Sequence, residues 1–429
     1  MSAVPAWPPG EETAVAWSPW RRFGFRLAFS YLVLYCVPFP IGLLPGTGPL
    51  STAYDGLWQG LAVWVGRVVL RLDKPITVFT NGSGDTTYNY VQVLCYAVLA
   101  LLIAALWTAL DRRPRHDRLR EALRVYLRWD LAWTMLGYGL SKVFVLQFQA
   151  PPPGRLMQPY GESSPMGLLW TFMGSSAPYT IFSGAAEVLG GGLLLFRRTT
   201  LLGALVCSAV MANVVMLNLC YDVPVKLYSM HLLAMAVYLL LPDLRRLGDL
   251  LLFDRPTRPA PAAAPWVPPR LARVMTVCKW ALILTLGFAQ LSEEVERARE
   301  VGQGALQIPM AGAFEVEEFR RGEQAVVPPA WKRLTISKWG FSVTLADASR
   351  LGFRHHHDAA RKTLALEPWP GQPGSATTLS YGFPSEGMAT LEGTYEGAPI
   401  RLRLRRVDTS KSLLVTRGFH WINEYPFNR

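Results

Sequence analysis

The sequence is poor in charged residues for its length. Asp, Glu, Lys and Arg make up only 17% of the 429 residues, whereas an ordinary soluble domain carries about 25%. The deficit falls mainly within residues 23–293, where apolar segments dominate. This composition excludes one water-soluble domain as a description of the whole chain. It favours a multi-pass membrane protein followed by a small domain of ordinary composition.

Cysteine and recognisable catalytic patterns are also scarce. The chain has 5 cysteines, none after Cys278, and no Cys-x-x-Cys or metal-ligand spacing. No Ser-His-Asp or paired-carboxylate pattern is present either, so we predict no metal site. The net charge of +12 does not indicate nucleic acid, because the arginines gather between apolar segments, as topology-setting residues do.

The apolar segments predict seven membrane spans, each of about 20 residues, the length that a ~30 Å hydrocarbon core requires. A further segment, residues 51–72, is amphipathic and carries Trp58, Trp64, Arg67 and Arg71, so we expect an interfacial helix there. The expected spans are residues 23–45, 89–110, 125–148, 177–196, 199–219, 226–242 and 272–292.

Orientation follows from the arginines. They gather beside the first span and in alternate connections, whereas the remaining connections, 46–88, 149–176 and 220–225, are poor in bases. Because Lys and Arg mark cytoplasmic loops, we expect a bacterial inner-membrane protein with a cytoplasmic N-terminus and an extracytoplasmic C-terminus. The expected domains are a tail (1–22), a membrane bundle (23–254), a Pro/Ala-rich cytoplasmic linker (255–271), a last span (272–292) and a tail domain (312–429).

The tail domain is expected to be all β. Short alternating segments between Ala313 and Tyr425 are separated by turn residues, and Gly397 marks a hairpin. This pattern favours a lipocalin-like up-and-down barrel. The last two strands are expected at Ser412–Thr416 and Phe419–Tyr425, and the residues expected to face inward are Leu402, Leu404, Leu413 and Val415. In the triplet His355–His357, neighbouring rings would point to opposite faces, which disfavours joint metal binding.

Glu187 is the most unusual residue of the bundle, because it lies near the middle of the fourth span. A charge at that depth costs roughly 2.5–3.5 kcal/mol and must be paired, neutralised or turned toward a polar cavity. Gly184 and the glycines at 190–192 permit neighbouring helices to approach closely and bury it. A polar site inside the bundle is therefore predicted.

Other polar residues would complete this site. Tyr138 and Lys142 share a face of the third span because they are four residues apart. We assign catalytic roles to Glu187, Lys142 and His231. The candidate ligand-binding residues are Tyr138, Asn213, Asn218 and Asp222. The alternative is a hydrogen-bond network that only fixes helix packing.

Two short motifs resemble those of the DoxX-like membrane family. They are Gly137-Tyr-Gly-Leu-Ser-Lys142 and the segment from Gly184 to Thr199, which contains Glu187-Val-Leu-Gly-Gly. The resemblance covers residues 125–246 and implies a four-helix core. Some members of that family are linked to quinone-coupled sulfur oxidation, so the resemblance implies a quinone as the candidate cofactor.

Three functions follow as hypotheses. The first is a quinone- or lipid-linked oxidoreductase component, in which Glu187 relays a proton and Lys142 or His231 holds the quinone oxygen. The second is a non-enzymatic scaffold or lipid-binding protein whose β-domain binds a ligand or a protein partner. The third is similarity to vitamin-K-carboxylase-like membrane enzymes, in which Lys142 would be the base. Membrane lipid is a partner in all three.

Overall fold

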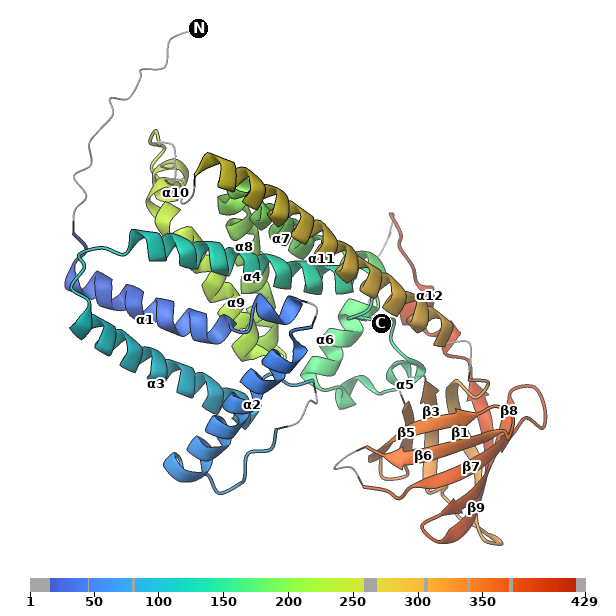
Figure 1. Cartoon of the computed structure of the whole chain (residues 1–429). Helices are drawn as coiled ribbons and strands as arrows, with labels where there is room; N and C mark the ends of the chain where they lie inside the picture. The colour runs from blue at the N-terminus through green and yellow to red at the C-terminus, as the bar shows by residue number, and fades with distance from the viewer. Residues whose placement is uncertain are drawn as a thin grey trace. The chain divides into compact units, whose positions relative to one another are not determined.

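The computed structural model describes residues 16–44, 46–78, 82–257, 268–304, 308–337, 340–369 and 373–421. The chain divides into two compact units (Figure 1). The helical unit comprises residues 1–139 and 186–286, and the barrel unit comprises residues 140–185 and 287–429.

Long helices build the helical unit. Helix α1 (Pro19–Cys36) packs against α3 (Thr87–Leu110), and α8 (Thr200–Cys220) packs against α9 (Lys226–Leu240). Parts of three further helices complete the unit. They are the first parts of α4 (Asp117–Val143) and α11 (Pro269–Gly304) and the second part of α7 (Ala177–Leu195). The shorter elements are η1 (Ile41–Leu43), α2 (Gly48–Trp64), η2 (Val65–Val69), η4 (Arg197–Thr199), η5 (Leu241–Asp243) and α10 (Leu244–Leu251).

Within the described residues, five stretches of helix are long and apolar enough to cross a membrane: Pro19–Leu43, Thr87–Leu110, Arg197–Cys220, Lys226–Leu251 and Arg273–Gly302. They match five of the seven expected spans. The other two fall on α4 and α7. Helix α4 carries ionisable side chains along its length, and α7 has a Glu and several small or polar residues, so neither is apolar enough by composition alone. The count of seven stays a prediction.

A smaller core lies between α2 and α3, and a larger one joins α1, α4, α7, α8 and α9. Its fully buried members include Leu127 and Leu131 of α4, Leu194 of α7, Cys207 of α8 and Met235 of α9. Glycines bring α7 and α8 together, as the sequence predicted. A Cβ atom on Gly190 would lie 2.7 Å from the Cys207 sulfur, and one on Gly203 would lie 2.9 Å from the Leu194 nitrogen. Neither position has room for a side chain without a shift of its neighbours.

The barrel unit contains a closed antiparallel barrel of eight strands. Strand β1 pairs with β3, the chain meanders in order to β9, and β9 pairs back with β1 to close the barrel. The short β2 extends β1 at one end. The strands are β1 (Gly312–Arg321), β2 (Gln324–Ala325), β3 (Trp331–Ser337), β4 (Gly340–Leu345), β5 (Arg350–Asp358), β6 (Thr363–Pro368), β7 (Thr377–Gly382), β8 (Met388–Tyr395) and β9 (Ala398–Val407).

Alternation of apolar and polar residues explains this barrel. In β9 the buried residues are Ile400, Leu402 and Leu404, and arginines between them point outward. Leu402 and Leu404 therefore face inward as expected. The predicted hairpin is also confirmed, with Glu396 and Gly397 at positive φ between Tyr395 and Ala398. Buried apolar side chains from its strands form a core inside the barrel.

The segment after β9 differs from the prediction. Leu413–Thr416 forms the short helix α12, and the side chains of Leu413 and Val415 are 47% and 53% exposed rather than inward-facing. The physical reason is that β1 already pairs with β9, which leaves no free barrel edge for another strand. The last expected strand is not present in Phe419–Trp421, and its remaining residues lie outside the described part of the chain.

Within the barrel unit, the segment between α4 and α7 lies against the barrel. The Arg333 guanidinium donates a hydrogen bond to the Met157 carbonyl (3.1 Å), and Arg350 forms an ion pair with Glu162 (3.1 Å). The elements of this segment are α5 (Pro153–Leu156), η3 (Tyr160–Glu162) and α6 (Pro165–Gly174). The connection predicted to be extracytoplasmic is thus in contact with the C-terminal barrel.

Candidate functional site

Glu187 is buried in the helical unit, as the sequence predicted, with only 2% of its surface exposed. It lies on α7, and its electrostatic neighbours include Tyr138 on α4 and Cys207 on α8. The ring of Tyr138 in turn lies 6.1 Å from that of Tyr228 on α9. Lys142, in the last turn of α4, is also buried.

His231 on α9 lies among tyrosines of α1. Its ring stacks on that of Tyr35 at 3.8 Å with an angle of 3° between the planes. Its Nδ1 lies 2.6 Å from the Leu227 carbonyl, and its Nε2 lies 2.6 Å from the Tyr31 hydroxyl. A carbonyl only accepts hydrogen bonds, so Nδ1 carries a proton. In the neutral ring, Nε2 then accepts from the Tyr31 hydroxyl, which fixes the tautomer.

Asp130 is the residue that sequence reasoning missed. It lies on α4 beside the Cys36 thiol of α1, and that thiol lies 4.0 Å from the Met235 sulfur. The electrostatic neighbours of this pair include Tyr35, Tyr126 and Tyr228. The available signal was the one that identified Glu187: a carboxylate within a hydrophobic segment. It was less visible because the N-terminal half of α4 carries many other charges.

These groups form a continuous series through the helical unit, which we call the internal polar line. Neighbouring members are joined by a hydrogen bond, a ring contact or an electrostatic interaction. The line draws on α1, α4, α7 and α9. A hydrogen bond joins Tyr31 to His231, whereas other neighbours are in ring or electrostatic contact, and its hydroxyl, thiol, carboxyl and imidazole groups can each hold or release a proton. Its members are Glu187, Tyr138, Tyr228, Asp130, Cys36, Tyr35, His231 and Tyr31.

Three predicted ligand-binding residues do not join this line. The Asn218 amide donates to the Ser229 hydroxyl (2.9 Å), which ties α8 to α9. Asp222 lies in an exposed turn at positive φ and pairs with Lys226 (2.8 Å). Asn213 is exposed on α8. Helix rotation and the α8–α9 turn therefore place these three residues away from the internal polar line, and their role in ligand binding stays a prediction.

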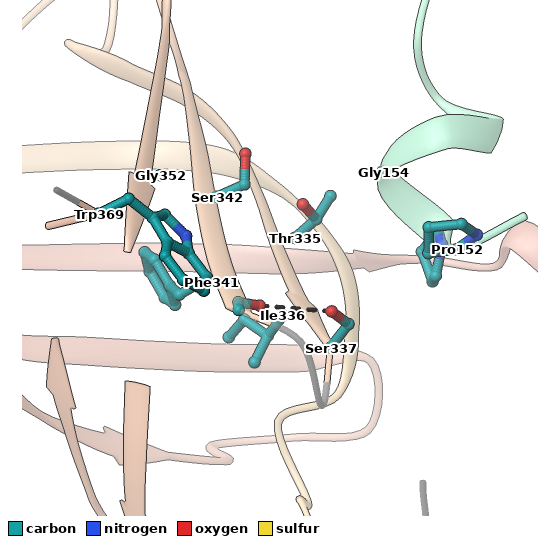
Figure 2. A pocket seen from close by; sticks show the side chains of 11 residues that line it. Pro152, Gly154, Thr335, Ile336, Ser337, Phe341, Ser342, Gly352 and Trp369 are labelled. Atoms are coloured by element: carbon teal, nitrogen blue, oxygen red, sulfur yellow. Dashed lines mark hydrogen bonds between the residues drawn. The ribbon is translucent and has the colours of Figure 1, made fainter. Parts of the chain in front are cut away.

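A second region of interest lies in the barrel unit. A cavity of about 220 Å³ is bounded by Pro152, Thr335, Phe341 and Trp369, as Figure 2 shows. It is smaller than the roughly 300–1,000 Å³ of typical ligand pockets. We assign it no ligand.

The histidine triplet lies on β5. His357 contacts the Tyr381 hydroxyl through Nε2 (2.8 Å), whereas His356 is exposed. Across the described residues, no group of three or more His, Cys, Asp or Glu side chains is placed to hold a metal ion.

Comparisons with known proteins give one informative relative. A stretch of 133 residues, 30% of this chain, is 36% identical to the uncharacterized protein YwoB of Bacillus subtilis and covers 84% of it. No family model matches the chain. No solved structure matches it either. Most of the relative therefore corresponds to one stretch of this longer chain.

Proposed function

The chain belongs to the family of the Bacillus subtilis protein YwoB, and from that premise we propose that it is a DoxX-like membrane protein that binds a quinone or similar lipid-soluble ligand. The matched stretch makes up 84% of YwoB, so a protein that consists of little more than this stretch exists. The internal polar line carries the proposal.

The chemistry of quinones suits this line. Quinone oxygens accept hydrogen bonds, and full reduction takes up two electrons and two protons. The Tyr31 hydroxyl donates to His231 Nε2 (2.6 Å), and on quinone binding it would donate to a quinone oxygen in place of the histidine. Asp130 and Glu187 supply carboxyl groups that can carry protons. In the oxidoreductase version, Glu187 relays the proton, His231 or Lys142 holds a quinone oxygen, and a partner protein supplies the electrons.

The proposed topology has seven spans in the bacterial inner membrane, with the N-terminus in the cytoplasm and the barrel outside. Two observations support it. Helices α4 and α7 share one core with α1, α8 and α9, so they suit spans of the same bundle. The connection 149–176, predicted to be extracytoplasmic from its few basic residues, contacts the barrel through Arg333 and Arg350, which suits an extracytoplasmic barrel.

A binding experiment tests the proposal. The purified chain in lipid nanodiscs is titrated with a short-chain quinone, and quenching of intrinsic fluorescence reports binding. Replacing His231 by Gln should weaken binding about tenfold, because one hydrogen bond is lost or misplaced. Glu187→Gln should leave binding in place but slow any quinone reduction. Asn213→Ala, on the exposed face of α8, is the matched control and should bind like the parent chain.

A scaffold function is the second candidate, and one observation favours it. Both nitrogens of His231 already have partners, and its ring is stacked closely on Tyr35, as in a network that only fixes helix packing. The two candidates predict different results. If no quinone binds and His231→Gln lowers only the thermal stability, the scaffold is correct and the quinone proposal is wrong.

A further inference from the structure

A group of cationic side chains lies at the end of the helical unit where α4 begins and α7 passes into α8. Arg128 of α4 has Arg124 and Arg197 as electrostatic neighbours, and Lys279 of α11 has Arg128 as one. Arg198 follows Arg197 in η4. We call Arg124, Arg128, Arg197, Arg198 and Lys279 the cationic cluster.

Carboxylates do not balance this cluster. Glu121 and Asp243 lie close to it, but both interact with Arg124, at 3.6 and 3.8 Å. Glu121 is also an electrostatic neighbour of Arg128. Within the described residues, no ion pair within 4 Å joins Arg128, Arg197 or Lys279 to a carboxylate. Like charges held together in this way repel, unless an anion joins them.

Arg128 is also directed toward the start of a helix. Its Nη1 donates a hydrogen bond to the Thr200 hydroxyl (3.3 Å) at the first residue of α8. No side chain caps α8, and its first turn has no acidic residue. The N-terminus of a 21-residue helix carries positive partial charge, so a cation there is unfavourable by itself.

The guanidinium of Arg128 has a nitrogen without a hydrogen-bond partner. Its Nε is buried and has no hydrogen-bond partner among the described residues, and the same holds for Nε of Arg124. A topology-setting arginine would extend into water and would need no partner. A buried donor without a protein partner, beside other cations, is available to an acceptor such as a water molecule or a ligand oxygen.

Aromatic rings surround the cluster. The Lys279 ammonium lies 4.7 Å from the Trp280 ring and 5.7 Å from the Trp129 ring, and Arg128 lies 5.7 Å from Trp129. Tryptophan is enriched at the headgroup depth of membranes, where its ring is half apolar and half wet. This neighbourhood matches the boundary between acyl chains and phosphate groups.

We propose that the cationic cluster is a binding site for a phosphate group, supplied by an anionic phospholipid headgroup or by a soluble phosphate. Arg128, Lys279 and the open N-terminus of α8 would hold the phosphate oxygens, and Trp129 and Trp280 would lie beside the glycerol and upper acyl region. The site uses none of the internal polar line, so it stands independently of quinone binding.

Lipid retention measured by native mass spectrometry tests this site. The full chain in detergent is titrated with phosphatidylglycerol and, separately, with phosphatidylcholine. We expect selective retention of phosphatidylglycerol. The double variant Arg128→Gln, Lys279→Gln should weaken it about 30-fold, at roughly fivefold for each cation near the surface. Arg118→Gln removes one exposed charge from the same end of α4 and should change retention little.

A second arm separates the two sources of phosphate. Inorganic phosphate is added to the lipid-free protein, and the melting temperature is recorded. A phosphate-dependent rise that the double variant loses, without lipid selectivity, assigns the site to a soluble ligand. If the double variant does not fold, Arg197→Gln, Arg198→Gln replaces it, because both residues are exposed. Equal retention of the two lipids together with no phosphate effect overturns the proposal, as does retention by the variants equal to that of Arg118→Gln.

Discussion

Arg26 shows how single side chains of this protein are held away from water. It lies on α1 with only 1% of its surface exposed. Its guanidinium donates to the His116 imidazole (3.0 Å to Nε2) and to the Asp111 carbonyl (2.7 Å). A charged arginine has no acceptor atom, so the Nε2 of His116 must offer its lone pair. This arrangement requires a neutral histidine.

The stability of the protein should therefore depend on pH through His116. The pKa of His116 lies below its ordinary value, mainly because the ring is buried and next because of the Arg26 charge. The charges of Arg113 and Arg22 lower it further, and that of Asp111 opposes them. Because the pKa of His116 is lower in the folded protein than in the unfolded chain, where it is about 6.5, the neutral histidine contributes its full stabilisation above pH 6.5. This contribution is lost as the pH falls through the pKa of the folded state. We expect the melting temperature in detergent to drop on acidification from pH 7 toward 5.

The variant His116→Gln checks this assignment. Glutamine can still accept from Arg26 but does not titrate in this range, so the acid-induced drop should become smaller. His356→Gln, an exposed histidine on β5, is the control and should retain the drop. Equal pH profiles for the parent and His116→Gln would mean that other groups cause the dependence.

Glycine sets the distance between helices at the scale of elements. Gly190, Gly191 and Gly192 follow one another in α7, but their surroundings differ. A Cβ on Gly190 would meet the Cys207 sulfur at 2.7 Å, and one on Gly191 would meet the Ala132 carbonyl at 2.9 Å, whereas one on Gly192 would meet nothing within 4 Å. Two of the three glycines are thus required by packing against α8 and α4.

Alanine substitutions should separate these roles. Gly190→Ala forces α7 and α8 apart or displaces Cys207, and we expect it to cost about 1–3 kcal/mol of stability. Gly192→Ala has room for its methyl group and should be neutral or stabilising by up to about 1 kcal/mol, because alanine favours a helix over glycine. Thermal unfolding in detergent measures both. Equal destabilisation by the two substitutions would contradict the close contact at Gly190.

The barrel has a hydrophobic core of its own, separate from the two cores of the helical unit. Leu404 on β9 is fully buried in the barrel core, whereas Leu413 on α12 is 47% exposed. Leu404→Ala should therefore cost about 2–5 kcal/mol. Leu413→Ala should fall within about 0.5 kcal/mol of the parent, as exposed substitutions do. Loss of the barrel's near-ultraviolet circular dichroism on heating reports the difference. A large effect of Leu413→Ala would restore an inward-facing role for that residue.

The orientation of the whole chain can be measured directly. With the barrel outside the cytoplasm, proteinase K added to spheroplasts should degrade the barrel or release it by cleavage before Gly312, and leave the cytoplasmic connections intact. Inside-out vesicles should give the reverse result and expose the Arg-rich connection 111–116. Protection of the barrel in intact spheroplasts would invert the proposed topology.

The sequence by itself determined the parts that depend on local pattern. Long apolar segments predicted helices long and apolar enough to cross a membrane, alternation predicted strands of the barrel, and Gly397 marked a hairpin. Each of these patterns satisfies the backbone and buries one face within a few residues. It also singled out Glu187 as a buried charge. The tertiary structure decided which polar groups meet. Helix rotation placed Asp130 beside Cys36 and His231 beside Tyr31 but turned Asn213 outward, and the β1–β9 pairing left Leu413 without a barrel edge. Such contacts join residues that are distant in the chain, so no local pattern contains them.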